Sequence, residues 1–183
     1  GEGRQRLVGS PFATYFTDLW FEHHDGVEDF RVIRHRGQRR LVEEDLSALA
    51  DLASPGPGIP RELVGGKAYS RGAMVLHQLR WLLGDDVFRA GIRRWVADGA
   101  DKPVTSEDFR ASMEAASGRD LAWFFEQWVY GAGFPDCAVR VEWDEAGKTL
   151  IWRLRQQQPV RGGVGIFRFP VEVEAVAGGT TWR

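Results

Sequence analysis

The chain has 183 residues and a formal net charge of −2 at neutral pH. That length suffices for one domain with a buried core, or for one domain and part of a second. The near-neutral charge excludes recruitment of nucleic acid or an acidic membrane by a general electrostatic field. The single cysteine, Cys137, excludes an internal disulfide and favours a cytoplasmic location without fixing it. No apolar run is long enough to cross a bilayer, so no membrane segment is expected.

The N-terminal part of the chain carries helical patterns. Bulky apolar residues at helical spacing predict a helix over 12–24, and Gly26 follows as a stop signal. A second helix is expected from Val27. The charged run at 34–40 is interpreted as a solvated helix face or a bend. Residues 41–53 then return to helical spacing.

The middle of the chain opens with a clear break. Three prolines and two glycines at 54–60 cannot continue a helix. A broad apolar stripe then predicts a helix over 68–84, ended by its terminal glycine. Another helix is expected over 85–100, with Asp85 or Asp86 as its N-cap.

Two more helices are expected before the character of the sequence changes. Thr105 and Asp108 have the spacing of a capping box, which predicts a helix start at 106 and an end at Gly118. The segment 120–133 reads as a helix dense in aromatic residues, which we interpret as core.

Alternating apolar and polar residues indicate strands after Phe134-Pro135. Segments 137–143 and 149–157, joined by a short turn, predict a β-hairpin. A third strand is expected over 166–176, where Pro170 implies an edge or a bulge. Three strands with no helix to cover them form an incomplete sheet. The fold class predicted is therefore α+β.

Four segments in this order resemble the aminopeptidase N-type zinc metallopeptidases, which are gluzincins similar to membrane alanyl aminopeptidase. They are FATYFTDLW, AYSRGAMVLHQLRWLLGDDVF, SEDFRASMEAASGRDLAWFFEQWVYGAGFP and the paired strands from Ala138. The resemblance implies that 12–133 is the helical part of the peptidase catalytic domain. It implies that 134–183 begins a β-sandwich domain. Residues 1–11 are interpreted as foreign to the natural protein or altered.

In this family one zinc ion assists hydrolysis of N-terminal residues from peptides. Two His and a Glu of an H-E-x-x-H helix, with a further Glu one helix later, form the zinc site. No H-E-x-x-H occurs in these 183 residues, and Ser10 stands where the further Glu is expected. Zinc is therefore expected in the intact enzyme and not in this chain, which is expected to be inactive alone.

Tyr69 is the one catalytic candidate in the chain. From its residue type alone, it reads as a half-buried tyrosine near a helix start. The resemblance places it at the family's transition-state tyrosine, whose hydroxyl donates a hydrogen bond to the developing oxyanion. Arg71 and Gly72 follow it as a basic residue and a glycine do in the family.

The partners implied for the intact enzyme are a peptide substrate and the remainder of the catalytic domain. A second hypothesis treats the chain as a non-catalytic helical binding module derived from the peptidase family, and Ser10 is its main support. The lone His77, in the middle of a predicted helix, is interpreted as a partly buried structural histidine.

Overall fold

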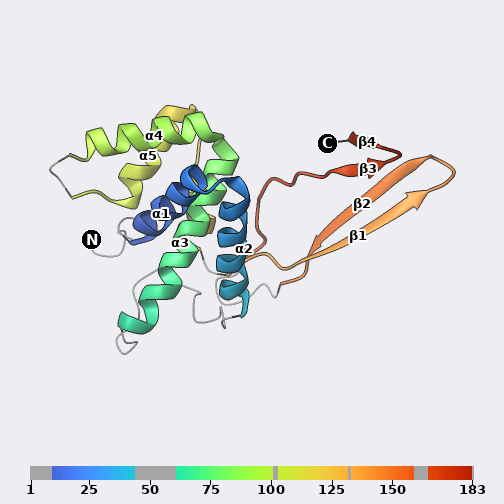
Figure 1. Cartoon of the computed structure of the whole chain (residues 1–183), viewed down its shortest axis with the longest axis horizontal. Coiled ribbons are helices and arrows are strands. Elements are labelled where there is room, and N and C mark those ends of the chain that lie inside the picture. Colours follow the sequence, from blue (N-terminus) through green and yellow to red (C-terminus); the bar gives the residue numbers. More distant parts are fainter. Residues whose placement is uncertain (1–9, 44–60, 101–102, 132, 159–164, 183) are drawn as a thin grey trace.

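The computed structural model describes residues 10–43, 61–100, 103–131, 133–158 and 165–182. Within these ranges, the side chains of residue 10 and of 40–43 and 61–69 are outside the description. The helices gather at one end of the molecule, and a long β-hairpin projects away from them (Figure 1). The predicted α+β class is confirmed.

Five α-helices form the helical part that the structure describes. They are α1 (Ser10–His24), α2 (Val27–Glu43), α3 (Arg61–Leu83), α4 (Asp85–Asp98) and α5 (Ser106–Ser117). A short turn, α6 (Ala122–Phe124), leads directly into a π-helix, η3 (Phe125–Tyr130). The helix predicted over 120–133 is therefore shorter, and six of its nine described helical residues are π-helical.

The charged run 34–40 lies inside α2, so the helix face is the correct one of its two interpretations and the bend is wrong. Its side chains at 35, 36, 38 and 39 are exposed, whereas only 11% of the Arg34 side chain is exposed. Residues 41–43 complete α2, and the predicted segments at 44–53 and 54–60 lie outside the described residues. Helix α3 begins at Arg61, seven positions before the start predicted at 68.

A single residue, Gly84, separates α3 from α4. Its φ of +83° suits a glycine, and its main-chain N–H bonds the Arg80 carbonyl at 2.8 Å. Gly84 also occupies the N-cap position of α4 without any side-chain cap. The prediction that Asp85 or Asp86 caps α4 is therefore wrong, since Asp85 is already inside the helix and binds Arg80 instead.

The capping box of α5 is confirmed. The Thr105 hydroxyl accepts a bond from the Asp108 N–H at 3.2 Å, and the Asp108 carboxylate accepts one from the Thr105 N–H at 2.8 Å. Gly118 closes the helix in the left-handed conformation, with φ of +64°. These contacts satisfy main-chain groups that a helix leaves unpaired at its ends.

The core lies where α1 crosses the other helices. Phe12 stacks on Trp95 at 4.6 Å and meets Phe109 edge-on at 5.0 Å, which joins α1 to α4 and α5. Tyr15 is fully buried one turn later, whereas Trp20 is 54% exposed. The face of α1 that is buried therefore includes Tyr15 and leaves out Trp20, although Trp20 belongs to the apolar stripe of the sequence.

The predicted hairpin is confirmed as β1 (Cys137–Asp144) paired antiparallel with β2 (Thr149–Gln156). Val141 lies opposite Trp152, and Trp143 lies opposite Leu150, so the same-face side chains make an apolar surface. The Trp143 side chain is 56% exposed within this chain.

The third predicted strand, over 166–176, is wrong for most of its length. Segment 165–174 pairs with no strand among the described residues, and only β3 (Ala175–Ala177) with β4 (Thr180–Trp182) forms a small second hairpin. Glutamine carboxamides bind the main chain at Phe167 and Arg168 in place of a neighbouring strand. Whether the helical and β parts are separate domains, divided at 133/134, stays a prediction.

Candidate functional site

Helix α3 carries the sequence-predicted catalytic residue. Tyr69 is the ninth residue of α3 and lies in its third turn, because the helix begins at Arg61. The prediction that this tyrosine stands at a helix start is therefore wrong. The Tyr69 side chain lies outside the described residues, so its catalytic role stays a prediction.

The turn after Tyr69 allows close packing. Gly72 and Ala73 are buried, and Ala73 is only 1% exposed. The Arg71 guanidinium donates from Nη2 to the Gly131 carbonyl at 3.1 Å, which connects α3 to the end of the π-helix. The small size of Gly72 and Ala73 therefore allows other parts of the core to approach α3 closely.

Helix α1 crosses α3 beyond this turn. The Tyr15 hydroxyl lies 3.1 Å from His77 Nδ1, and Glu22 binds Arg80 further along both helices. Tyr15 precedes Glu22 on α1, and their partners His77 and Arg80 follow in the same order on α3. Positions 10 and 69 therefore both precede the crossing, on its N-terminal side.

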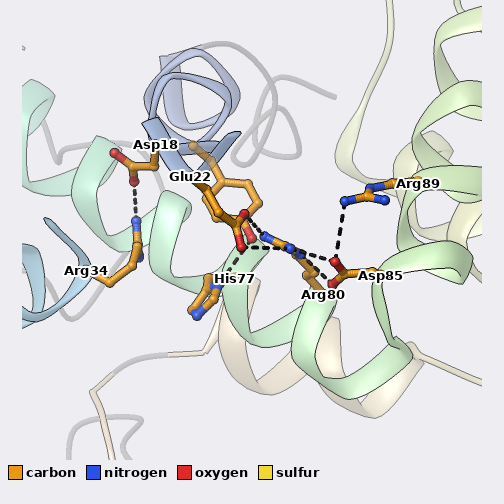
Figure 2. Close-up of polar contacts among 8 residues, drawn as sticks. Asp18, Glu22, Arg34, His77, Arg80, Asp85 and Arg89 are labelled. Atoms are coloured by element: carbon orange, nitrogen blue, oxygen red, sulfur yellow. Dashed lines mark hydrogen bonds and ion pairs between the residues drawn. The ribbon is translucent and has the colours of Figure 1, made fainter. Parts of the chain in front are cut away.

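Arg80 forms the centre of a buried polar cluster (Figure 2). Its Nη1 and Nη2 donate to the two Glu22 carboxylate oxygens at 2.5 and 3.1 Å. Its Nε and Nη2 also donate to the two Asp85 oxygens at 2.7 Å each. The guanidinium fork is thus held by one carboxylate from α1 and one from α4.

A second ion pair joins α1 to α2. Arg34 binds Asp18 through Nη1, and both side chains are almost fully buried, at 11% and 12% exposure. The other terminal nitrogen of Arg34 contacts Met74 Sδ of α3 at 2.6 Å. The cluster therefore connects α1, α2, α3 and α4.

Burial decides the protonation of the neutral members of the cluster. It lowers the pKa of His77 to about 4, helped by the positive charges of Arg34 and Arg80. It raises the pKa of Tyr15 to about 12. The hydrogen bond from Arg80 holds the pKa of Asp85 below its usual value, and the Asp85 bond raises the pKa of Arg80.

At neutral pH the cluster therefore contains a neutral imidazole, a neutral phenol and compensated ion pairs. The pKa values of His77 and Tyr15 both lie far from 7, so these two groups suit holding helices in place better than moving protons. A cavity of about 530 Å³ lies beside it between α1 and α4, with Glu22, Arg80 and Asp85 in its wall.

The described residues do not offer a metal site. Among them, no three His, Cys, Asp or Glu side chains come together in a way that could hold an ion. Ser10, at the position expected for a carboxylate ligand, is the first residue of α1 and supplies only a hydroxyl. The part of the chain that the structure describes therefore does not fit a zinc ion on its own.

The Arg80 cluster was not predicted from the sequence. One signal was available: Arg80 stands in the mainly apolar run LHQLRWLL, and an arginine buried there needs an acidic partner from another element. Asp18 and Glu22 are four residues apart on the same helix face. His77, interpreted as a partly buried structural histidine, is indeed half-buried against Tyr15 and Phe30.

No helix within the described ranges is long and apolar enough to cross a membrane.

Comparisons with known proteins agree with the segment order noted in the sequence. The family profile described as "Peptidase family M1 domain" matches residues 12–128. An aminopeptidase N of Haemophilus influenzae is 36% identical over 90 residues, which cover 49% of this chain and 10% of that protein. An aminopeptidase N of Caulobacter vibrioides is 30% identical over 125 residues, covering 68% of this chain and 14% of its own length.

The similarity also reaches into the β part. A membrane alanyl aminopeptidase of Heliothis virescens is 25% identical over 160 residues, which cover 78% of this chain. The match covers 15% of that relative. The chain thus corresponds to a small part of each of these relatives.

Proposed function

The chain belongs to peptidase family M1, and from this premise we propose that it is part of an aminopeptidase that hydrolyses N-terminal residues from peptides. Segment 12–133 is the helical part of the catalytic domain in this proposal, and 134–183 begins a β-sandwich domain. The intact enzyme uses one zinc ion, whose ligands come from parts of the protein outside these 183 residues.

The packing of α1 on α3 is the observation that carries the proposal. In the family resemblance, α1 starts at the position of a zinc ligand and α3 carries the transition-state tyrosine. Along their helices, positions 10 and 69 both precede the Tyr15–His77 and Glu22–Arg80 contacts that join α1 to α3. A shared site requires these two positions to lie near each other in the intact enzyme.

The role proposed for Tyr69 is to donate a hydrogen bond from its hydroxyl to the oxyanion that forms when water attacks the peptide carbonyl. A phenol with an ordinary pKa near 10 keeps its proton at neutral pH. A fixed donor aimed at developing charge contributes to the rate because it binds the transition state better than the substrate. Peptide substrate and the rest of the catalytic domain are the proposed partners.

Substitution of Tyr69 in the full-length enzyme tests this role. Tyr69→Phe should lower kcat by roughly 10²–10³, as loss of one oxyanion donor does, with little change in KM. Tyr130→Phe is the matched control, since it removes a phenol hydroxyl that binds Glu107 at 2.8 Å within the helical part. A near-normal kcat for Tyr69→Phe removes this residue from the mechanism.

The isolated chain gives an independent test. Elemental analysis should detect no zinc bound to it, and it should not turn over aminopeptidase substrates. Zinc bound in a 1:1 ratio by this chain alone would contradict the proposal, because Ser10 and the described side chains do not supply a ligand set.

Ser10 favours one alternative, in which the chain is a helical binding module derived from the peptidases and without catalysis. A serine hydroxyl cannot replace a carboxylate ligand on zinc. The natural gene sequence upstream of Phe12 separates the two proposals. A zinc-binding helix encoded there supports the enzyme, and its absence supports the binding module.

A further inference from the structure

The Arg80 side chain is bound at once by carboxylates from two other helices, Glu22 of α1 and Asp85 of α4. Its side chain is 11% exposed, and that of Glu22 is 22% exposed. The partner on α4, Asp85, is 49% exposed and follows Arg80 across the Gly84 corner. The pair that links α1 to α3 is therefore the more deeply buried of the two.

Buried ion pairs contribute little to net stability, because the desolvation cost offsets most of the attraction. Such pairs are better at selecting one arrangement among several, since removing the partner of a buried charge is strongly destabilising. Sliding α1 by one turn along α3 moves it about 5.4 Å. That displacement would separate Arg80 from Glu22. The side of the guanidinium that faces α1 would then have no carboxylate partner.

Apolar contacts do not impose the same penalty. Aliphatic and aromatic side chains tolerate repacking when volume and pattern are kept. The guanidinium fork instead needs two oxygens in its plane, and Glu22 supplies both, at 2.5 and 3.1 Å. The Tyr15–His77 contact, at 3.1 Å, extends the same interface toward the N-terminal ends of the helices.

We propose that Arg80, acting through Glu22, is a positioning residue that fixes the register of α1 against α3. Its consequence is a fixed spacing between positions 10 and 69, which precede the crossing on both helices. The catalytic part of this inference rests on the proposed aminopeptidase function, and the register itself does not.

Distance measurements on the 183-residue chain test the register. Spin labels at Ala13→Cys and Trp81→Cys, in a Cys137→Ser background, report the α1–α3 distance by double electron–electron resonance. Both labelling positions are exposed. A single narrow distance distribution is expected with the native ion pair.

The decisive variant is Glu22→Met with Arg80→Met, which removes the pair and leaves Asp85 at the solvent-facing rim. The labelled double variant should remain folded by circular dichroism and show a distribution that is broadened or shifted by about 5 Å, one helical turn. A folded double variant with an unchanged narrow distribution overturns the proposal.

Two further variants keep the test decisive. The matched control replaces Arg94 and Asp98, an exposed pair within α4 at 3.5 Å, by methionines and should leave the distance unchanged. If the double variant does not fold, Arg80→Lys takes its place, since it keeps the charge and loses the fork. An unchanged narrow distribution in Arg80→Lys then overturns the proposal.

Kinetics of the full-length enzyme separate the two parts of the inference. Removal of the Glu22–Arg80 pair should lower kcat about 10- to 100-fold with little change in KM, as a misplaced catalytic group does. If the variant without the pair shows altered α1–α3 distances but a normal kcat, the proposal for the register stands and its catalytic consequence is overturned. The proposed function fails separately if the native full-length protein does not release N-terminal residues from peptides, and the role of Tyr69 alone fails if Tyr69→Phe is fully active.

Discussion

The Gln127 side chain makes two hydrogen bonds to the main chain of Arg168, as a neighbouring β-strand would. The Gln127 Nε2 donates to the Arg168 carbonyl at 2.7 Å, and the Arg168 N–H donates to Gln127 Oε1 at 2.7 Å. Gln156 of β2 binds Phe167 in the same manner, at 2.6 and 2.8 Å. Two carboxamides, one from the π-helix and one from β2, thereby attach segment 165–170 to both parts of the molecule.

Replacing Gln127 by methionine should release this attachment. Two partly exposed hydrogen bonds are lost, so we expect the free energy of unfolding to fall by about 1–2 kcal/mol. Amide hydrogen exchange at Arg168 should accelerate. Gln157→Met is the matched control, because Gln157 bonds an exposed carboxylate at 3.2 Å. Equal exchange at Arg168 in the variant and the native chain would contradict the role of Gln127.

Gly91 is required for the close contact between α4 and α5. A Cβ at this position would lie 2.4 Å from Met113 Sδ and 2.8 Å from its Cε. Overpacking of this kind costs about 1–3 kcal/mol, which exceeds the gain of about 0.5–1 kcal/mol in helix propensity. Urea unfolding of Gly91→Ala should therefore show a net loss of stability.

Gly37→Ala provides the contrast for Gly91→Ala. Nothing lies within 4 Å of the Cβ that it adds in α2, so stability should rise by about 0.5–1 kcal/mol. In a Met113→Ala background, Gly91→Ala should cost nothing further, since the space is then available. A destabilising Gly91→Ala in that background would place the strain elsewhere.

Acid should destabilise the chain through His77. The pKa of His77 is about 4 when folded and near 6.5 when unfolded, so the unfolded state takes up the proton first. The stability present above pH 6.5 is then lost as the pH falls toward 4. Because the ring is only half-buried, we expect a loss of about 1–2 kcal/mol between pH 7 and pH 4.

Urea unfolding at several pH values measures this effect in the native chain and in His77→Gln. The variant should lack the part of the acid dependence between pH 6.5 and pH 4 that comes from this imidazole. His35→Gln, at an exposed position of α2, should retain it. Parallel acid profiles for the native chain and His77→Gln would refute the assignment.

Raising the pH above 10 should destabilise the chain through Tyr15. Its pKa is about 12 when folded and near 10 when unfolded, so the unfolded state loses the proton first. Stability should fall as the pH rises from 10 to 12. Tyr15→Phe should abolish this fall. At neutral pH it should cost about 1–2 kcal/mol, because His77 loses its partner at 3.1 Å.

Local signals in the sequence predicted the local parts of the fold. The capping box at Thr105 and the hairpin from Cys137 depend on residues close together in the chain, and both are present. The start of α3 was missed, since nothing between residues 61 and 68 has a strong apolar period. The prediction of a strand around Pro170 is wrong. The alternation of apolar and polar residues there does not show that glutamine side chains, in place of a strand, hydrogen-bond to the main chain.

The candidate site shows the same division. Tyr69 could be identified only through a resemblance that spans many residues. The Arg80 cluster joins residues 58 positions apart, Glu22 and Arg80, and pairwise contacts over such separations leave no periodic trace in one sequence. The apolar neighbours of Arg80 in the sequence indicate that it is buried, but they do not identify Glu22 as its partner.

The apolar face of the β1–β2 hairpin has a practical consequence for work in solution. Val141, Trp143 and Leu150 are 53%, 56% and 45% exposed, and they lie together on one side of a two-stranded ribbon. An exposed apolar face of this kind favours self-association of the chain at the protein concentrations used for spectroscopy. Melting temperatures of the isolated chain should therefore rise with its concentration, and a single value would describe a mixture of monomers and assemblies.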